Sequence, residues 1–284
     1  MAEYFAGIDI GSTMTKAVIL GEGIAASVIG PTGAEQRRLA NKVMEEALDQ
    51  AGLAFEAISY VVATGYGRIN VPFADRQITE ITCHARGIHF LFPEARTVID
   101  VGGQDSKAIR IDSQGRPHDF IMNDKCAAGS GRFIEIIADT LNIPLEAVGD
   151  LSLQSTSPAT ISNLCTIWAQ QEVASSLAQG IPVPDLLAGV HRSLADRISR
   201  MAHRLRLEKP VVLTGGGSKN KGLIAALREY LNGDLLIPEN PLITGALGAA
   251  LMGRDLVEKA RQNNLPLETR PRILEAIHLL GSSD

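Results

Sequence analysis

Residues 7–20 read GIDIGSTMTKAVIL, and residues 98–111 read VIDVGGQDSKAIRI. Each stretch contains an apolar run, an aspartate, a turn with glycine, and a second apolar run that includes a lysine. This pattern predicts two strands joined by a tight turn, a hairpin, rather than a strand that leads into a helix. The repeat spacing of about 90 residues indicates two related halves that each begin with the same hairpin. The aligned pairs are Asp9 with Asp100, Gly11 with Gly102, and Lys16 with Lys107.

The segments around the hairpins have the alternation of an α/β protein. Apolar residues at helical spacing predict several helices, and short β-branched runs before glycine turns predict strands. Strands are expected in ISYVVATGYGR and in VVLTGGG. The glycine run of VVLTGGG lies between its strand and the helix expected at 219–231. Helices are expected at 34–52, from 80 to a stop at Pro93, at 131–142, 164–179, 185–206 and 219–231, and in a closing helix near 242–262.

The composition excludes several classes of protein. The chain has 284 residues, of which 45% are hydrophobic and 21% are charged, as in globular proteins. Its aromatic content of 4% and net charge of −5 argue against a nucleic-acid partner. No apolar run is long enough to span a membrane, and the first residues lack the pattern of a signal peptide. Three cysteines without close spacing favour a reducing, cytoplasmic location over a disulfide framework.

The two hairpins and the glycine run have the features of a phosphate-binding site. Glycines let backbone N–H groups approach phosphate oxygens, and the carboxylates of the hairpins are suitable oxygen ligands for Mg²⁺. A single Asp-x-Gly is more often only a hairpin turn, but two repeated copies followed by TGGG favour nucleotide binding. The predicted catalytic residues are Asp9, Asp100 and Gln104. The predicted cofactor-binding residues are Gly11, Ser12, Thr13, Lys16, Gly102, Gly103, Gly215, Gly216 and Gly217.

Seven stretches together resemble one family of the actin, heat-shock-70 and sugar-kinase superfamily. They are GIDIGSTMTKAVIL, ATGYGR, ITEITCHARG, VIDVGGQDSK, MNDKCAAGSGRF, LCTIWAQQEV and LTGGGSKNKG. The family is the BadF/BadG/BcrA/BcrD ATPases, which includes activators of 2-hydroxyacyl-CoA dehydratases and ATP-binding subunits of benzoyl-CoA reductase. The resemblance implies two ribonuclease-H-like halves, with mixed sheets flanked by helices and a nucleotide cleft between them. The expected domains are 1–94 completed by the closing helix near 242–262, 95–241, and a peripheral tail at 263–284.

The same resemblance implies an iron–sulfur cluster. Family members bind one [4Fe–4S] cluster between two subunits, and the family's ligand positions fall on Cys126 and Cys165. The cysteine count agrees, because a cubane cluster held by thiolates needs four of them and this chain has three. A two-fold dimer would supply four by doubling two. Both cysteines precede predicted helices, whose free N–H donors would stabilise an anionic cluster.

Other residues near these motifs have simpler interpretations. Cys83 is expected to be structural, and a lone His84 on a short helix is more often a packing or hydrogen-bonding residue than an acid or base. After Cys165 the chain reads TIWAQQEV where dehydratase activators commonly read TVFAESEV, so Trp168 and two glutamines lie near the expected cluster. This difference leaves the branch of the family open, and the stretch before Cys83 favours the benzoyl-CoA reductase type.

The function implied by the resemblance is ATP-dependent transfer of low-potential electrons. A ferredoxin or flavodoxin would reduce the cluster of a dimer, formed with itself or with a homologous subunit, and the acceptor would be a CoA-thioester reductase or dehydratase. ATP or ADP with Mg²⁺ would change the angle between the two halves. Two alternatives remain: an amino-sugar kinase of the same superfamily, and a chaperone-like ATP switch, neither of which needs a cluster.

Overall fold

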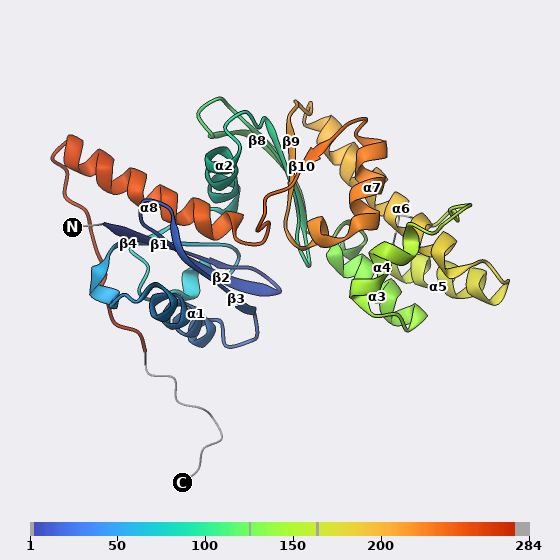
Figure 1. Cartoon of the computed structure of the whole chain (residues 1–284), viewed down its shortest axis with the longest axis horizontal. Helices are drawn as coiled ribbons and strands as arrows, with labels where there is room; N and C mark the ends of the chain where they lie inside the picture. The colour runs from blue at the N-terminus through green and yellow to red at the C-terminus, as the bar shows by residue number, and fades with distance from the viewer. Residues whose placement is uncertain (1–2, 125, 163–164, 276–284) are drawn as a thin grey trace, which may run out of the picture. The chain divides into compact units, whose positions relative to one another are not determined.

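The computed structural model describes residues 3–124, 126–162 and 165–275. The chain divides into two compact units, one made of residues 1–91 with 242–284 and the other of residues 92–241. Each unit contains a five-stranded mixed sheet with helices packed against it (Figure 1). None of the helices within the described ranges is both long and apolar enough to cross a membrane.

The first unit is built on a sheet of order β3-β2-β1-β4-β5. Its first three strands are antiparallel neighbours, and the fourth runs parallel to β1, so the sheet is mixed. In the register of the first hairpin, Asp9 lies opposite Lys16. The strands are β1 (Tyr4–Ile10), β2 (Met14–Leu20), β3 (Ile24–Pro31), β4 (Ile58–Thr64) and β5 (Arg76–Gln77).

Helices cover both faces of this first sheet. Helix α1 (Gln36–Ala51) packs on one face, while α2 (Glu80–Leu91) and α8 (Thr244–Gln262) pack on the other. Alternating side chains of β1 divide between the two faces: Ile8 joins the core with α1, and Phe5 joins the core with α8. This two-sided burial is why β1 reads as a nearly continuous apolar run.

The described part of the C-terminal tail also packs on the first unit. The guanidinium group of Arg272 donates hydrogen bonds to the Ile58 and Ser59 carbonyl oxygens and forms an ion pair of 2.7 Å with Asp75. The Asp75 side chain is fully buried, and Leu274 contacts the core beneath α1. The tail is therefore held to the sheet at least as far as residue 275.

The second unit repeats the arrangement with a sheet of order β10-β9-β6-β7-β8. Strands β6, β7 and β8 are antiparallel neighbours, and β9 runs parallel to β6. Asp100 lies opposite Lys107 in the second hairpin, as Asp9 lies opposite Lys16 in the first. The strands are β6 (Thr97–Val101), β7 (Ser106–Ile111), β8 (Pro117–Asn123), β9 (Val211–Thr214) and β10 (Leu235–Leu236).

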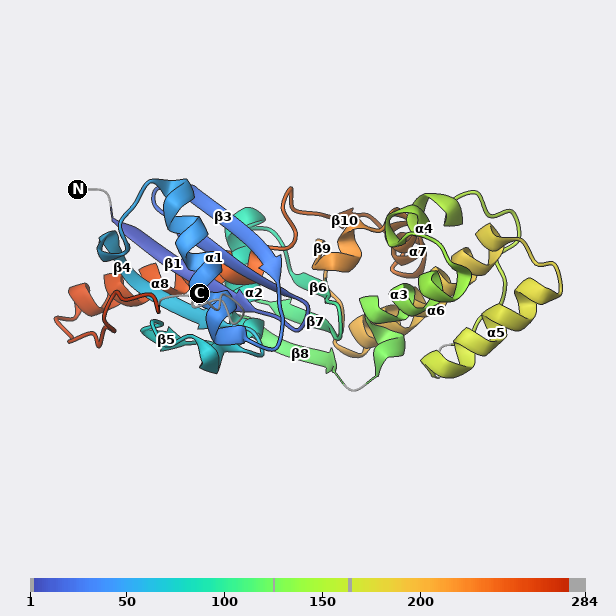
Figure 2. The same ribbon diagram turned by 90° about the horizontal axis from the view of Figure 1, so that it is seen from below.

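The helices of the second unit form one large core with its sheet. Figure 2 shows α3, α4, α5 and α6 grouped together beyond the end of the strands. Buried residues of α3 and α6, such as Phe133 and Leu194, belong to the same core as Val101 of β6. The helices are α3 (Gly131–Leu141), α4 (Leu145–Ser152), α5 (Thr166–Ala178), α6 (Val183–Arg204) and α7 (Lys221–Tyr230). Short 3₁₀ helices lie at Phe55–Ala57, Arg68–Asn70, Ala127–Gly129 and Gly216–Lys219.

The hairpins, the predicted helices and the two isolated strands are confirmed, with ends that differ by a few residues. Residue 164, where one helix was expected to start, lies outside the described residues. The sequence did not predict β3, β8 or α4. Both are edge strands with largely exposed side chains, and neither has a regular alternation of apolar and polar residues. Helix α4 has only eight residues and contains a glycine, which weakens the helical signal.

Candidate nucleotide and metal-cluster site

The first hairpin places a buried carboxylate at the end of a buried strand. Asp9 is 4% exposed, and its Oδ2 atom accepts a hydrogen bond of 3.0 Å from Lys16 Nζ across the hairpin. The turn closes with a bond of 3.1 Å from the Gly11 N–H to the Met14 carbonyl oxygen. The Ser12 side chain is half-buried and Thr13 is exposed, so the hydroxyl groups lie at the accessible tip of the hairpin.

Strand β4 brings a second glycine turn against Asp9. Thr64, the last residue of β4, lies beside Asp9 in the parallel register, and Gly65 follows with a φ of +83°. A Cβ atom on Gly65 would meet Asp9 Oδ1 and the Ile10 carbonyl oxygen. Only glycine combines this left-handed backbone with such a close approach to the carboxylate. The stretch ATGYG therefore belongs to the same site as the first hairpin.

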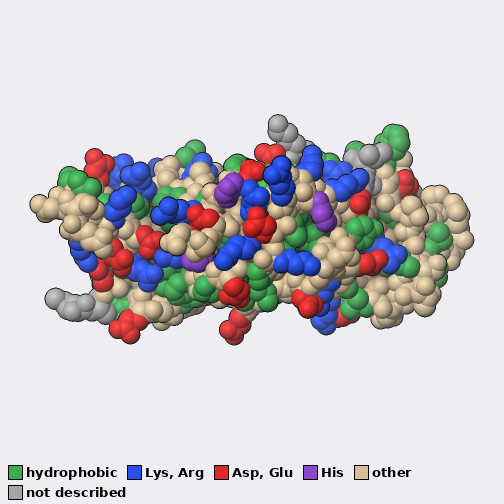
Figure 3. Space-filling model, turned by 90° about the horizontal axis from the view of Figure 1, so that it is seen from above, with side chains coloured by type: hydrophobic (Ala, Val, Ile, Leu, Met, Phe, Trp, Pro, Cys, Tyr) green, Lys and Arg blue, Asp and Glu red, His purple; other side chains and the backbone are tan. Residues whose placement is uncertain are grey.

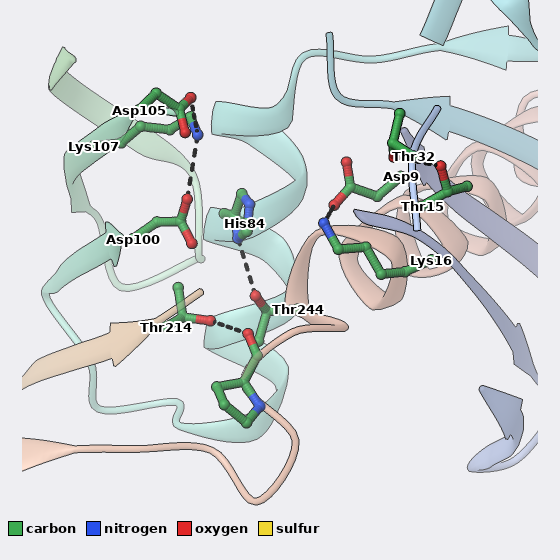
Figure 4. Close-up of polar contacts among 11 residues, drawn as sticks. Asp9, Thr15, Lys16, Thr32, His84, Asp100, Asp105, Lys107, Thr214 and Thr244 are labelled. Atoms are coloured by element: carbon green, nitrogen blue, oxygen red, sulfur yellow. Dashed lines mark hydrogen bonds and ion pairs between the residues drawn. The ribbon is translucent and has the colours of Figure 1, made fainter. Parts of the chain in front are cut away.

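A histidine from α2 lies in the same region of the first unit. His84 is 7% exposed, and its Nδ1 atom is 3.0 Å from Thr244 Oγ1 at the start of α8 (Figure 4). A Cβ atom on Gly245 would lie 3.1 Å from Asp9 Oδ2 and 3.2 Å from His84 Nε2, so both side chains approach the same point of α8. The hydrogen bond to Thr244 agrees with a hydrogen-bonding role for His84.

The second hairpin holds its lysine between two carboxylates. Lys107 Nζ lies 2.6 Å from Asp105 Oδ2 and 3.2 Å from Asp100 Oδ2 (Figure 4). All three residues are about 95% buried, because Asp100 is 4%, Asp105 5% and Lys107 5% exposed. The Gly102 N–H closes the turn on the Asp105 carbonyl oxygen at 2.9 Å, and Gln104 is exposed at the tip.

The TGGG stretch occupies the position in the second unit that ATGYG occupies in the first. Thr214 ends β9 beside Asp100, and Gly215 follows with a φ of +80°. A Cβ atom on Gly215 would lie 2.6 Å from Asp100 Oδ1 and 2.5 Å from the Val101 carbonyl oxygen. Thr214 Oγ1 donates a bond of 2.6 Å to the Pro241 carbonyl oxygen, which fixes the strand end. Gly216 is exposed and Gly217 is buried against β6.

The structure thus groups the predicted residues within each unit and adds others to them. Each group contains a buried carboxylate, a lysine and glycine turns, a set that fits Mg²⁺ and phosphate oxygens. The stretches ATGYG and LTGGG are also an aligned pair, which the sequence pattern had not led us to expect. That pairing was visible, because both stretches end a β-branched strand with Thr-Gly-x-Gly. Residues added by the structure are Thr64, Gly65, Asp105, Thr214 and Gly245.

The two candidate cluster cysteines precede helices in the second unit. Cys126 is the residue before the 3₁₀ helix Ala127–Gly129, and its carbonyl oxygen accepts bonds from Asn123 Nδ2 at 2.9 Å and the Gly129 N–H at 3.1 Å. Cys165 is the N-cap of α5, and its carbonyl oxygen accepts a bond of 3.0 Å from the Ala169 N–H. Both are half-buried, free thiols, as accessible ligands must be.

The Cys126 segment is bonded directly to the second hairpin. The Gly131 N–H, at the start of α3, donates to the Gly102 carbonyl oxygen at 2.9 Å. The neighbouring Arg132 N–H donates to the Gly103 carbonyl oxygen at 2.8 Å. The turn that is predicted to bind phosphate is therefore one side of a hydrogen-bonded junction, and the chain that follows Cys126 is the other.

The third cysteine differs from these two. Cys83 is fully buried in the first unit, and this burial raises the pKa of its thiol to about 12. A buried, protonated thiol agrees with the structural role expected for it. Among the described residues no group of three or more His, Cys, Asp or Glu side chains is arranged to hold a metal. Two thiols per chain fit a four-thiolate cluster only if a second subunit supplies two more.

The fold is that of the actin-type ATPases and sugar kinases. A structure of a ROK family glucokinase from Streptomyces griseus, in complex with glucose and AMPPNP, is similar to this chain with a TM-score of 0.55. The two share 15% identity over 89% of this chain and 99% of that one, so the likeness concerns the fold alone. The two mixed sheets flanked by helices are the ribonuclease-H-like halves expected from the sequence.

Within this fold the chain belongs to the BadF/BadG/BcrA/BcrD ATPase family, whose model matches residues 6–253. It is 47% identical to the activator of lactoyl-CoA dehydratase of Anaerotignum propionicum, over 90% of this chain and 99% of that protein. A benzoyl-CoA reductase component of Thauera aromatica is 34% identical over 89% of this chain and 94% of that protein. The activator of the 2-hydroxyisocaproyl-CoA dehydratase from Clostridium difficile, solved with bound ADPNP, is 42% identical, with a TM-score of 0.85 over 92% of this chain and 97% of that one.

Proposed function

We propose that this protein is an ATPase that drives single low-potential electrons to a CoA-thioester dehydratase or reductase. The family and its dehydratase activators support the ATPase role and the kind of acceptor. The higher identity to the dehydratase activator than to the benzoyl-CoA reductase component favours a dehydratase as the acceptor. The observation that carries the electron-transfer step is the pair of half-buried thiols of Cys126 and Cys165. The segment that follows Cys126 is hydrogen-bonded to the second hairpin, which is proposed to bind phosphate.

The two hairpins are proposed to bind Mg²⁺ and the phosphates of ATP. Asp9 and Asp100 would hold Mg²⁺ directly or through water, because magnesium prefers oxygen ligands and keeps several waters. The backbone N–H groups and hydroxyls at the turns would contact phosphate oxygens, and Gln104, exposed at its tip, is the candidate to orient the attacking water. The phosphate contacts are assigned to Gly11, Ser12, Thr13, Lys16, Gly102, Gly103, Gly215, Gly216 and Gly217.

Cys126 and Cys165 are proposed to give two thiolates to a [4Fe–4S] cluster that a second subunit completes. Such a cluster, when bound, accepts and releases one electron. The protein's own contribution is the position of each thiol before a helix, where free N–H donors and the helix dipole favour negative charge. Cys165 is the N-cap of the 13-residue helix α5, so the positive end of this helix dipole lies beside its thiol.

The junction between the second hairpin and α3 is the proposed route by which ATP affects the thiolates. A phosphate bound to the Gly102–Gly103 turn polarises and positions the same peptide groups whose carbonyl oxygens hold the start of α3. A shift of this turn would therefore move the segment that carries Cys126. The partners proposed from this mechanism are a second copy or a homologous subunit, a ferredoxin or flavodoxin as donor, and the CoA-thioester enzyme as acceptor, all in the reducing cytoplasm.

Anaerobic purification with iron counted per chain tests the proposal. The expected result is about two irons per chain, since four irons would be shared by two subunits. Cys126→Ser and Cys165→Ser should each remove the brown colour, whereas the control Cys83→Ala, which changes a thiol in the first unit, should keep it. Iron-free protein whose ATP turnover depends on an amino sugar would instead support a kinase. Retention of the cluster in either serine variant would overturn that ligand assignment.

A further inference from the structure

Three arginines form a basic face on the second half of α6. Arg197, Arg200 and Arg204 are spaced by three and four residues, so they lie on one side of the helix. Together with His203 they line a hollow of about 670 Å³ on the surface of the second unit. Figure 3 shows Lys and Arg side chains interspersed with Asp and Glu side chains on one face of the molecule. We call Arg197, Arg200, His203 and Arg204 the α6 basic face.

The α6 basic face has an excess of positive charge. Arg200 pairs with Asp196 at 2.6 Å, yet its side chain is 62% exposed. Arg204 is exposed and, among the described residues, has no ion-pair partner. A positive surface on a chain with a net charge of −5 favours the recognition of an acidic partner.

This basic face adjoins the segment that follows Cys126. The Arg197 Cδ atom lies 2.9 Å from the point where a Cβ of Gly129 would be, so the arginine stem packs on the 3₁₀ helix Ala127–Gly129. The Gly129 N–H in turn donates to the Cys126 carbonyl oxygen. A protein docked on α6 would consequently contact the surface immediately beside one of the two candidate cluster ligands.

We propose that the α6 basic face is the docking site of a small acidic electron-carrier protein, the donor of the proposed function on which this inference rests. One electron would leave the reduced carrier, which becomes oxidised, and would reduce the thiolate-bound cluster by one unit without proton transfer. A surface of a few arginines suits a transient encounter, because redox complexes are small and charge complementarity mainly raises their association rate.

Binding of an oxidised, acidic two-cluster ferredoxin to the cluster-loaded protein provides the test. The variant Arg200→Gln/Arg204→Gln removes two charges from the basic face and breaks one surface ion pair. Its matched control is Arg192→Gln/Arg228→Gln, which removes one charge each from α6 and α7 and also breaks one surface ion pair, that of Arg192 with Glu229. At low salt the first variant should bind the ferredoxin about tenfold more weakly, and the control should bind as the wild type does.

Reduction of the cluster separates the docking site from the function itself. With the ferredoxin as reductant, the first variant should be reduced about tenfold more slowly than the control, and added salt should remove the difference. With dithionite, both variants should be reduced at the wild-type rate. Equal ferredoxin binding by the two variants would overturn the docking site while leaving the cluster intact. Normal ferredoxin binding with impaired activation of the dehydratase would assign this face to the acceptor and also overturn the proposal. Absence of any cluster would instead contradict the proposed function.

Discussion

The first hairpin balances its lysine with one carboxylate, whereas the second hairpin balances its lysine with two. Asp9 pairs with Lys16 in the first unit, and Asp100 shares Lys107 with Asp105 in the second. The position of Asp105 in the repeat is taken by Met14, whose side chain is 38% exposed. The duplicated scaffold is thus retained while the charge at its end differs by one. The second hairpin is also the one that is bonded to the Cys126 segment.

The largest effect is expected from neutralising the aspartate that both hairpins have in common, which is Asp9 in the first and Asp100 in the second. Asp9→Asn and Asp100→Asn should each lower ATP hydrolysis about 100-fold or more, because both carboxylates are expected to hold Mg²⁺ at the phosphates. Hydrolysis of ATP by purified protein at saturating Mg²⁺ measures this effect. An activity near that of the wild type in either variant would remove that residue from the site.

The same two variants should differ in stability. Asp9→Asn leaves Lys16, whose side chain is only 13% exposed, without a carboxylate and should cost about 3 kcal/mol of unfolding free energy. Asp100→Asn leaves Lys107 paired with Asp105 at 2.6 Å and should cost about 1 kcal/mol. Urea unfolding of the cluster-free proteins gives both values. Equal losses would mean that Asp105 does not support Lys107.

The glycines beside the two aspartates should be equally intolerant of a side chain. Gly65→Ala and Gly215→Ala place a Cβ against a carboxylate at a positive φ, so each should cost about 2 kcal/mol or more and weaken ATP binding. The control is Gly52→Ala, at a φ of +63° with open space around it, which should cost only about 1 kcal/mol. Unfolding curves and nucleotide titration report the two effects. If all three variants behave alike, the backbone strain matters and the approach to the carboxylate does not.

The regular part of each half could be predicted from sequence because it depends on local patterns. A run such as TVIDV followed by a glycine turn specifies a buried strand and a hairpin without reference to the rest of the chain. The edge strands Ile24–Pro31 and Pro117–Asn123 could not be predicted in this way, since their pairing depends on a neighbour and their exposed side chains carry no alternation.

The grouping of Asp9 with Lys16 and of Asp100 with Lys107 could be predicted, because each pair belongs to one hairpin. The contacts of Asp105 and Gly65 could not be read from spacing, because each forms only when strands align. Lys107 lies two residues after Asp105, yet whether its amine reaches that carboxylate depends on the conformation of the turn. His84 approaches Asp9 through α8, 160 residues further along the chain, and no local pattern carries that information.

The buried histidines offer another comparison of the two units. His84 has Thr244 as a partner, whereas His191 is 1% exposed on α6 with neither ring nitrogen hydrogen-bonded among the described residues. Burial lowers the pKa of His191 to about 4 from an ordinary value of 6.5. The folded state therefore disfavours the protonated ring, and the unfolding free energy should fall by about 2 kcal/mol as pH decreases from about 7 to about 5.

Replacement of this histidine should remove that part of the acid sensitivity. His191→Met keeps a side chain of similar size against Gly222 of α7 and cannot titrate. Its unfolding free energy should vary less between about pH 7 and about pH 5 than that of the wild type, by about 2 kcal/mol. Urea unfolding at the two pH values measures the difference. Parallel pH dependence in the two proteins would contradict a buried, neutral His191.

The smallest effect is expected for Asp105→Asn. This variant is most informative when it is combined with Asp100→Asn in a double-mutant cycle. Alone, Asp105→Asn should cost about 1 kcal/mol, because Lys107 can still pair with Asp100 at 3.2 Å. The double variant leaves Lys107 with neither carboxylate, which is the situation that Asp9→Asn creates for Lys16. Its loss should therefore exceed the sum of the two single losses and approach the roughly 3 kcal/mol expected in the first unit. Additive losses in this cycle would show that the two carboxylates act independently. Neither carboxylate would then compensate for the loss of the other, although both lie within ion-pair distance of Lys107.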